Sequence, residues 1–134
     1  MNRKRYWEML PPSRSAAKYA QLAQQAEARG LEGVFSIQFA SNPWVPLGAV
    51  AASSSRLRLG TGIALAFTRS PYETALAALD LDQLSEGRFT LGLGTSLGWI
   101  HDEHYGSAYA HPVARMAEVV RIIKLILSGE ARKA

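Results

Sequence analysis

Apolar and polar positions along the chain follow a pattern that predicts a strand and then a helix, four times in succession. Each predicted strand is a short run rich in β-forming residues, and each predicted helix has apolar positions at helical spacing. The predicted strands cover residues 6–10, 34–38, 57–64 and 89–93. The predicted helices cover residues 16–29, 43–52, 71–84 and 112–127.

Signals at the helix ends support these boundaries. Ser15 is a suitable N-cap for the first helix, and Gly30 lies just past its end. Asn42 is expected to cap the second helix, with Pro43 at its first position. The third helix begins with a capping box, Ser70-Pro71-Tyr72-Glu73, and the fourth ends at Ser128-Gly129. Apolar spacing predicts buried faces formed by Leu76, Leu79 and Leu84 in the third helix and by Met116, Val119, Val120, Ile123 and Ile126 or Leu127 in the fourth.

Four consecutive β-α units predict an α/β fold with parallel strands and right-handed crossovers. A doubly wound sheet would place a glycine-rich loop after the first strand, where this chain has Pro11-Pro12-Ser13. A (β/α)8 barrel needs about 250 residues, and the chain has 134. The pattern therefore favours half of a (β/α)8 TIM-type barrel, a single truncated domain over residues 1–134.

Composition and charge narrow the functional class. The chain has no cysteine, which excludes disulfides, thiolate catalysis and cysteine-ligated zinc. It has no apolar run long enough for a membrane span and no signal-peptide pattern, so a cytoplasmic location is expected. The net charge is +4, but the cations are scattered apart from Arg3-Lys4-Arg5, so nucleic-acid binding is not predicted.

Two glycine pairs lie at the ends of predicted strands, in Gly60-Thr61-Gly62 and Gly92-Leu93-Gly94. Neither completes a dinucleotide-binding fingerprint, because Leu65 and Leu97 occupy the positions of the third glycine. Both lie at the carboxyl end of a parallel strand, the end at which barrel enzymes carry their active sites. Glycine there permits either close approach of a flat ligand or a tight turn, and the pattern alone leaves both interpretations open.

A loop of 17 residues follows Gly94 and is long enough to suggest function. Within it, His101-Asp102-Glu103-His104 resembles part of a metal site, but no third ligand at a typical spacing is visible. A solvated loop with one histidine near a substrate pocket is favoured, and no metal site is assigned. A hydrolase triad using Ser96 lacks the Gly-x-Ser-x-Gly elbow. Arg88 is expected to form a structural pair with Asp80 or Asp82.

Several stretches taken together resemble the luciferase-like monooxygenase superfamily, (β/α)8 enzymes that use FMN or the deazaflavin coenzyme F420. The resemblance extends from about Ala16 to the fourth helix and is closer to the F420-dependent branch than to luciferase itself. The matching stretches are residues 26–34 (AEARGLEGV), 57–63 (LRLGTGI), 67–71 (FTRSP), 79–89 (LDLDQLSEGRF), 91–94 (LGLG) and 112–118 (PVARMAE).

The resemblance implies where a cofactor binds. In this family the third strand ends in a bulge with a non-prolyl cis peptide that supports the ring, which corresponds here to Gly62-Ile63. The end of the fourth strand would lie beside the ring or its polar edge. Several members carry an acidic residue or histidine after the second strand, where this chain has Gln38-Phe39, so no catalytic residue is assigned. The implied cofactor-binding residues are Gln38, Gly62, Ile63, Ala64, Gly94, Thr95 and Ser96.

The resemblance also implies a function and a partner. We expect an F420- or FMN-dependent oxidoreductase that acts on a small-molecule substrate by hydride transfer or O2-dependent monooxygenation. The later strands of the family are absent, so the chain corresponds to the amino-terminal half, and little activity is expected from it alone. An open half-barrel exposes sheet edges and an apolar face, which predicts a homo-oligomer or a partner half-barrel. The alternative is a non-catalytic half-barrel that acts only through such assembly.

Overall fold

The computed structural model describes residues 5–13, 15–39 and 41–130, so Arg3 and Lys4 of the predicted basic cluster lie outside the described residues. The chain divides into two compact units. The first contains residues 1–64 and 80–92, and the second contains residues 65–79 and 93–134. Each unit is described by itself.

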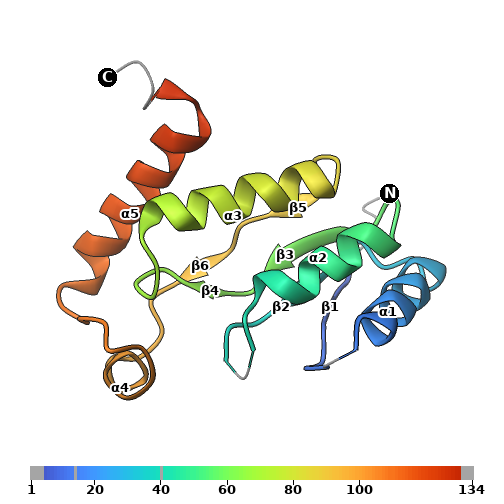
Figure 1. The fold of residues 1–134 in the computed structure, drawn as a ribbon, viewed down its shortest axis with the longest axis horizontal. Helices are drawn as coiled ribbons and strands as arrows, with labels where there is room; N and C mark the ends of the chain where they lie inside the picture. The colour runs from blue at the N-terminus through green and yellow to red at the C-terminus, as the bar shows by residue number, and fades with distance from the viewer. Residues whose placement is uncertain (1–4, 14, 40, 131–134) are drawn as a thin grey trace. The chain divides into compact units, whose positions relative to one another are not determined.

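A four-stranded parallel sheet forms the centre of the first unit (Figure 1). The strands are β1 (Trp7–Met9), β2 (Gly33–Ser36), β3 (Arg58–Thr61) and β5 (Phe89–Thr90), in the order β1-β2-β3-β5. Val34 of β2 lies opposite Glu8 of β1 and opposite Leu59 of β3, which in turn lies opposite Phe89. Sequential parallel strands in this order confirm the predicted β-α repeat.

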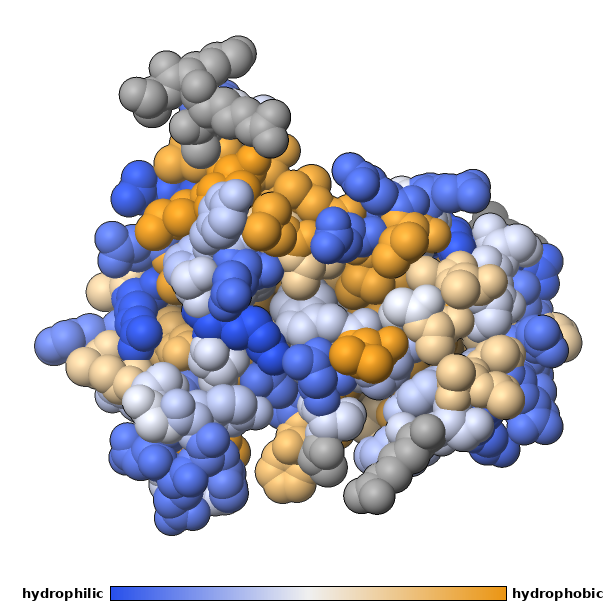
Figure 2. Space-filling model, viewed as in Figure 1, coloured by the Kyte–Doolittle hydropathy of each residue, from blue (hydrophilic) through white to orange (hydrophobic). Residues whose placement is uncertain are grey.

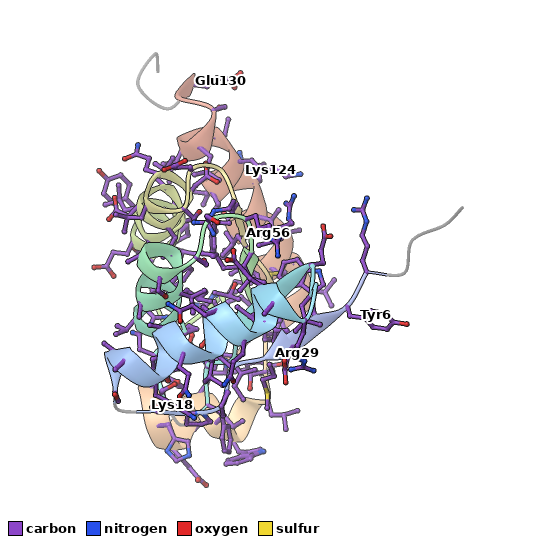
Figure 3. The ribbon with its side chains drawn as sticks, turned by 90° about the vertical axis from the view of Figure 1, so that its right-hand side faces the viewer. Tyr6, Lys18, Arg29, Arg56, Lys124 and Glu130 are labelled. Atoms are coloured by element: carbon purple, nitrogen blue, oxygen red, sulfur yellow. The ribbon has the colours of Figure 1, made fainter. Side chains whose placement is uncertain are left out.

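Helices α1 (Ala16–Ala28) and α2 (Trp44–Ser53) pack against each other and against this sheet. In Figure 3, Lys18 lies near the beginning of α1 and Arg29 lies just past its end. Alternation along β2 directs Val34 and Ser36 into the interior between sheet and helices. The buried apolar core consists of Leu10, Tyr19, Ala23, Ala26, Val34, Leu47, Val50, Ala51, Leu57, Leu59 and Leu81.

The other sheet face carries the ring of Trp7. A Cβ added at Gly33 would lie 2.8 Å from this ring, and one added at Gly60 would lie 3.4 Å from it. The ring therefore occupies the space that two missing side chains leave on the neighbouring strands. Trp7 is 36% exposed and Met9, two residues later, is 46% exposed. This face consequently presents apolar side chains to solvent.

The predicted helix starts are confirmed with one shift. Ser15 Oγ accepts a hydrogen bond from the N–H of Lys18 at 3.3 Å, and Gly30 has a positive φ of 73° after α1. Helix α2 begins at Trp44, one residue later than expected. The Asn42 side chain still accepts a hydrogen bond from the N–H of Trp44 at 3.0 Å.

Two of the four predicted strands are interrupted. The strand predicted over 57–64 divides into β3 and β4 (Ala64–Leu65), and the one over 89–93 divides into β5 and β6 (Leu93–Gly94). Strands β4 and β6 form a separate two-stranded sheet. Both interruptions fall in apolar, glycine-containing runs, and such runs give no signal for where ladder pairing stops.

Helix α3 (Pro71–Leu84) begins as the capping box predicts, since Ser70 Oγ accepts a hydrogen bond from the N–H of Glu73 at 3.1 Å. Its predicted buried face is wrong, because Leu76 is 40% exposed and Leu84 is 65% exposed. Three of the four residues buried instead are smaller than leucine. The buried positions of this helix are Thr74, Ala75, Ala78 and Leu81.

The second unit contains the segment predicted as one long loop. That segment instead includes two helical pieces, α4 (Gly98–Ile100) and the π-helix η1 (His101–Tyr105). Helix α5 (Pro112–Leu127) follows and buries Val119 and Ile123 of its predicted apolar face. The other predicted positions are not fully buried: Met116, Val120 and Ile126 are half-buried, and Leu127 is exposed. Apolar side chains also gather on the surface over the C-terminal part of α5 (Figure 2). Within the described part of the chain, no helix combines the length and the apolar character needed to cross a membrane.

Candidate cofactor site

A backbone bulge follows β3. The peptide bond between Gly62 and Ile63 is cis, which confirms the geometry that the family resemblance implies. The N–H of Gly62 donates to the carbonyl of Ser36 at 2.8 Å, and the carbonyl of Ile63 accepts from the N–H of Gln38 at 3.2 Å. The bulge is thus tied to the end of β2.

A third bond holds the bulge on its other side, where the N–H of Ala64 donates to the carbonyl of Gly92 at 2.9 Å. Ile63 remains 37% exposed while Ala64 is buried. A Cβ on Gly62 would lie 2.7 Å from the Phe35 ring, so glycine is required here for packing against the strand below. The bulge therefore presents one apolar side chain, Ile63, on a backbone fixed from two directions.

The structure brings together the four predicted site residues of the first unit. Gln38 is 7% exposed and lies beside Ile63 through the backbone hydrogen bond described above. Gly62, Ile63 and Ala64 are consecutive on the bulge. An exposed aliphatic side chain on a rigid support is a suitable surface for a planar ring, so these residues fit a flavin-type group.

The three predicted residues of the second unit are consecutive, from Gly94 at the end of β6 to Ser96. The carbonyl of Gly94 accepts a hydrogen bond from the N–H of Ala66 at 2.9 Å. Ser96 adopts a positive φ of 59°, a conformation that non-glycine residues seldom adopt. The Tyr109 hydroxyl donates to the Ser96 carbonyl at 2.9 Å and holds this turn in place. The segment offers hydroxyl and backbone groups that can bind polar atoms of a ligand.

His101 contributes to the same segment and was not predicted from the sequence to do so. Its side chain is fully buried, which makes the interpretation of a solvated loop wrong for this residue. Nδ1 lies 2.7 Å from Ser107 Oγ, and Nε2 lies 2.7 Å from the Thr95 carbonyl oxygen. A carbonyl oxygen only accepts hydrogen bonds, so Nε2 carries the proton that binds Thr95. In the sequence, the only indication of a partner for this histidine was Ser107, six residues later.

Aromatic rings surround this histidine. The ring centroids of Tyr109, Phe67 and Tyr105 lie 5.2, 5.8 and 6.2 Å from that of His101. The Arg115 guanidinium lies 4.3 Å from the Phe67 centroid and also donates to the carbonyl of Ala108. The loop between β6 and α5 is therefore an ordered cluster. Within the described residues, no group of three or more histidine, aspartate or glutamate side chains is arranged to hold a metal ion.

Arg88 has the structural role that the sequence suggests, but the expected partners, Asp80 and Asp82, are wrong. All five of its N–H groups donate, and every acceptor but one is a backbone carbonyl. Nε donates to the Ser85 carbonyl at 2.6 Å, and the terminal nitrogens bind the last turn of α2 and the connection that follows it. The acceptors there are the carbonyls of Ala51, Ser54 and Leu57 and the hydroxyl of Ser54, at 2.8–3.2 Å. With all donors used, Arg88 is not available to bind an anion.

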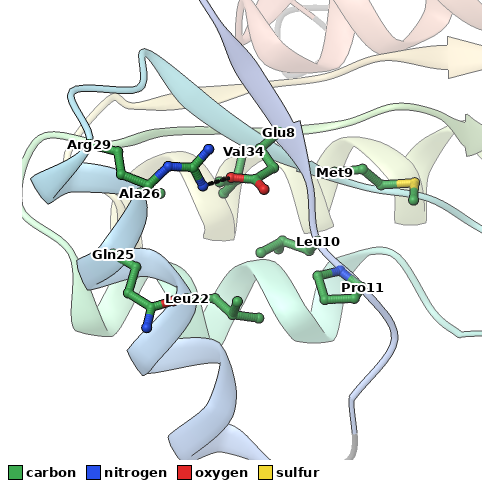
Figure 4. A pocket seen from close by; sticks show the side chains of 9 residues that line it. All are labelled: Glu8, Met9, Leu10, Pro11, Leu22, Gln25, Ala26, Arg29 and Val34. Carbon is green, nitrogen blue, oxygen red and sulfur yellow. Dashed lines mark hydrogen bonds and ion pairs between the residues drawn. The ribbon is translucent and has the colours of Figure 1, made fainter.

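A small hollow of about 170 Å³ lies between β1 and α1 in the first unit (Figure 4). Leu10, Leu22 and Val34 line its apolar part, and an ion pair between Arg29 and Glu8, with 2.7 Å between Nη1 and Oε2, lies at its edge. None of the predicted cofactor-binding residues lines this hollow. We therefore do not assign the cofactor to it.

Comparison with known proteins identifies the family. The sequence profile described as luciferase-like monooxygenase matches residues 4–134. A Mycobacterium tuberculosis protein named "Putative coenzyme F420-dependent oxidoreductase Rv3520c" is 35% identical over 127 residues, which are 94% of this chain and 35% of that protein. The chain thus spans about a third of the length of this curated relative.

Solved structures show the same fold. The F420-dependent tetrahydromethanopterin reductase of Methanopyrus kandleri matches with a TM-score of 0.74 and 24% identity, over 92% of this chain and 38% of that one. The oxygenating constituent of 3,6-diketocamphane monooxygenase from Pseudomonas putida, solved with FMN, matches with a TM-score of 0.67 and 20% identity. The match covers 92% of this chain and 38% of that one. The predicted fold class, four parallel β-α units that correspond to half of a (β/α)8 barrel, is confirmed.

Proposed function

The chain belongs to the luciferase-like monooxygenase family, and on that basis we propose that it carries the ring-binding part of an F420- or FMN-dependent oxidoreductase. The observation that carries this proposal is the bulge at Gly62-Ile63, tied by backbone hydrogen bonds to Ser36, Gln38 and Gly92, with the exposed Ile63 side chain on it. F420 is the first choice, because the relative at 35% identity is named for that coenzyme. FMN is the alternative.

The protein's contribution would be binding and orientation. Either cofactor supplies hydride transfer through its ring, and FMN also supplies reaction with O2. Ile63 would provide an apolar surface for the ring, and Gln38 a buried polar side chain beside it. For Thr95 and Ser96, in the other unit, the role in binding polar atoms of the cofactor is the one that the family resemblance implies. The substrate would be a small molecule that exchanges hydride or oxygen with the cofactor.

Titration of the purified chain with F420 and with FMN, followed by cofactor fluorescence, tests this proposal. Saturable binding of at least one cofactor is expected, and replacing Ile63 with Ala should weaken it several-fold. Val113→Ala is the matched control, because Val113 is an aliphatic side chain on α5 that is 85% exposed and lies outside the proposed site. Absence of binding to both cofactors would contradict the proposal.

We also propose that the chain self-associates, or associates with a partner that supplies further β-α units. The support is the exposed apolar sheet face that carries Trp7 and Met9, which parallel α/β sheets ordinarily cover. Sedimentation velocity should show a dimer or larger species, and Met9→Lys should dissociate it, whereas Val113→Lys should not. A monodisperse monomer would contradict self-association. Assembly without cofactor binding would favour the non-catalytic half-barrel.

A further inference from the structure

We infer that His101 is a positioning residue, whose Nε2–H holds the Thr95 carbonyl and thereby sets the backbone of Thr95 and Ser96 for the cofactor. This inference rests on the proposed function, because that function gives the Thr95-Ser96 segment its ligand. It assigns a role to a buried ionisable side chain that neither the fold nor the proposed chemistry has used so far.

The argument begins with burial. His101 is 0% exposed, and a buried polar side chain is costly unless its hydrogen bonds are made. Both of its nitrogens have partners at 2.7 Å, Ser107 Oγ and the Thr95 carbonyl oxygen. Because Nε2 must donate to the carbonyl, Nδ1 is the acceptor of the neutral ring and the Ser107 hydroxyl donates to it. The two bonds fix the tautomer as well as the position of the ring.

The segment held by His101 is one that needs support. Ser96 has a φ of 59°, and a non-glycine residue keeps such a conformation only where its surroundings enforce it. The Tyr109 hydroxyl binds the Ser96 carbonyl at 2.9 Å, one residue beyond the carbonyl that His101 binds. Consecutive carbonyls, Thr95 and Ser96, are thus each held by a separate side chain. Neither side chain is predicted to contact the cofactor itself.

The rings of these two side chains also support each other. The His101 and Tyr109 centroids lie 5.2 Å apart, and both rings contact Phe67. Arg115 packs over Phe67 from α5. The two donors are therefore anchored to α5 and to the segment after β4, and they do not depend on the ligand for their orientation. This is the arrangement expected for preorganised support of a binding segment.

The test separates hydrogen bonding from volume. His101→Phe fills the same space without a donor, and His101→Gln places an amide N–H where Nε2–H lies. Tyr109→Phe removes the hydroxyl that donates to the Ser96 carbonyl and, at 3.4 Å, to Thr95 Oγ1. His104→Phe and His104→Gln are the matched controls, because His104 is exposed in the same π-helix. All variants are made in the full 134-residue chain.

The first readout needs no cofactor. Long-range ¹H–¹⁵N spectra of the labelled wild type should show His101 protonated at Nε2 and unprotonated at Nδ1. Amide exchange at residues 95 and 96 should become about ten-fold faster in His101→Phe and Tyr109→Phe, and should stay near wild type in His101→Gln. The His104 variants should not differ from wild type.

The second readout is the dissociation constant for F420 and for FMN, from fluorescence titration. His101→Phe should weaken binding about ten-fold, and His101→Gln should restore it to within about three-fold. The inference is overturned if His101→Gln has the same exchange and affinity as His101→Phe. It is also overturned if His101→Phe retains wild-type exchange and affinity, or if Nε2 of His101 is unprotonated in the wild type. If the wild type binds neither cofactor, the proposed function fails, while the exchange data still decide whether His101 sets this backbone.

Discussion

Thr61 and Gly92 are joined by two hydrogen bonds through one side-chain atom. Thr61 Oγ1 donates to the carbonyl of Gly92 at 2.7 Å and accepts from its N–H at 2.9 Å. Ladder pairing between β3 and β5 ends one step earlier, at Gly60 and Thr90. The threonine side chain therefore continues the link between the two chain segments where the backbone no longer pairs, directly before the bulge at Gly62-Ile63.

Gly92→Ala should destabilise the protein strongly. An added Cβ would overlap the Thr61 carbonyl oxygen, and both groups belong to backbone that cannot move freely. We expect the free energy of unfolding to fall by about 3 kcal/mol, measured by urea denaturation. Gly48→Ala is the control, because nothing lies within 4 Å of its added Cβ. A glycine-to-alanine change inside a helix should leave stability equal or raise it by about 0.5 kcal/mol.

Thr61→Val should cost about 2 kcal/mol of stability, because it keeps the shape, removes the acceptor of the Gly92 N–H, and leaves the Gly92 carbonyl with the Ala64 N–H alone. Thr61→Ser keeps the hydroxyl and should recover most of that loss. Chemical denaturation of the two variants in parallel measures the difference. Equal stability of Val and Ser at this position would show that the side-chain link contributes nothing.

Arg88→Lys should destabilise the turn after α2 although it preserves the charge. A lysine ammonium has three donors and cannot match the five positions that the planar guanidinium occupies. We expect a loss of about 2 kcal/mol, seen as a lower urea midpoint with an unchanged slope. Arg121→Lys, at an exposed position of α5, should stay within about 0.5 kcal/mol of wild type. Equal midpoints for the two variants would contradict the role of Arg88.

Glu27 should make the stability depend on pH below its ordinary pKa of 4.5. Burial alone would raise this pKa, but the backbone N–H groups of Arg56, Leu57 and Ser55, with the Arg56 charge, lower it. One carboxylate oxygen, Oε1, accepts from all three N–H groups at 2.8–3.0 Å. Because the folded pKa is lowered, the stabilisation is present above pH 4.5 and is lost as the pH falls through the folded pKa.

Glu27→Gln tests this pH dependence. At pH 7 the variant should be less stable than wild type by about 1 kcal/mol, because the neutral amide is a weaker acceptor. The difference should shrink below pH 4.5, as the wild-type carboxylate takes up a proton. Thermal or urea unfolding between pH 3 and pH 7 measures it. Glu118→Gln, at an exposed position of α5, should show no such trend, and a pH-independent deficit in Glu27→Gln would contradict the prediction.

The helix ends were predictable because each depends on local chemistry. Ser15 and Ser70 bind N–H groups three residues ahead, and Gly30 and Gly129 have the positive φ that follows a helix C-terminus. Such contacts involve neighbours along the chain, so the sequence contains all the information needed. The same holds for α5, whose apolar spacing identified both of its buried residues correctly.

The remaining features depend on partners that are distant in sequence. The strand interruption at Gly62-Ile63 follows from bonds to Ser36, Gln38 and Gly92, and only the family resemblance pointed to it. The burial of Ala75 in place of Leu76 depends on which residues pack against α3, and the spacing of apolar residues along the helix does not reveal those partners. The sequence favoured a solvated loop with one histidine near a pocket but could not say which histidine, and the π-helix directs His101 into the interior.

Two side chains, Glu27 and Arg88, hydrogen-bond the backbone of the connection between α2 and β3. Glu27 binds its N–H groups at 55–57, while Arg88 binds its carbonyls at 51, 54 and 57. Apart from the Ser54 hydroxyl and the Arg56 guanidinium, these contacts do not involve the side chains of the connection. The exposed side chain at 55 can therefore change without loss of this corner, whereas Ala51 and Leu57 are also buried in the core. An insertion or deletion of one residue there would displace both sets of backbone groups at once. The hydrogen bonds of Glu27 and Arg88 therefore constrain the length of this connection.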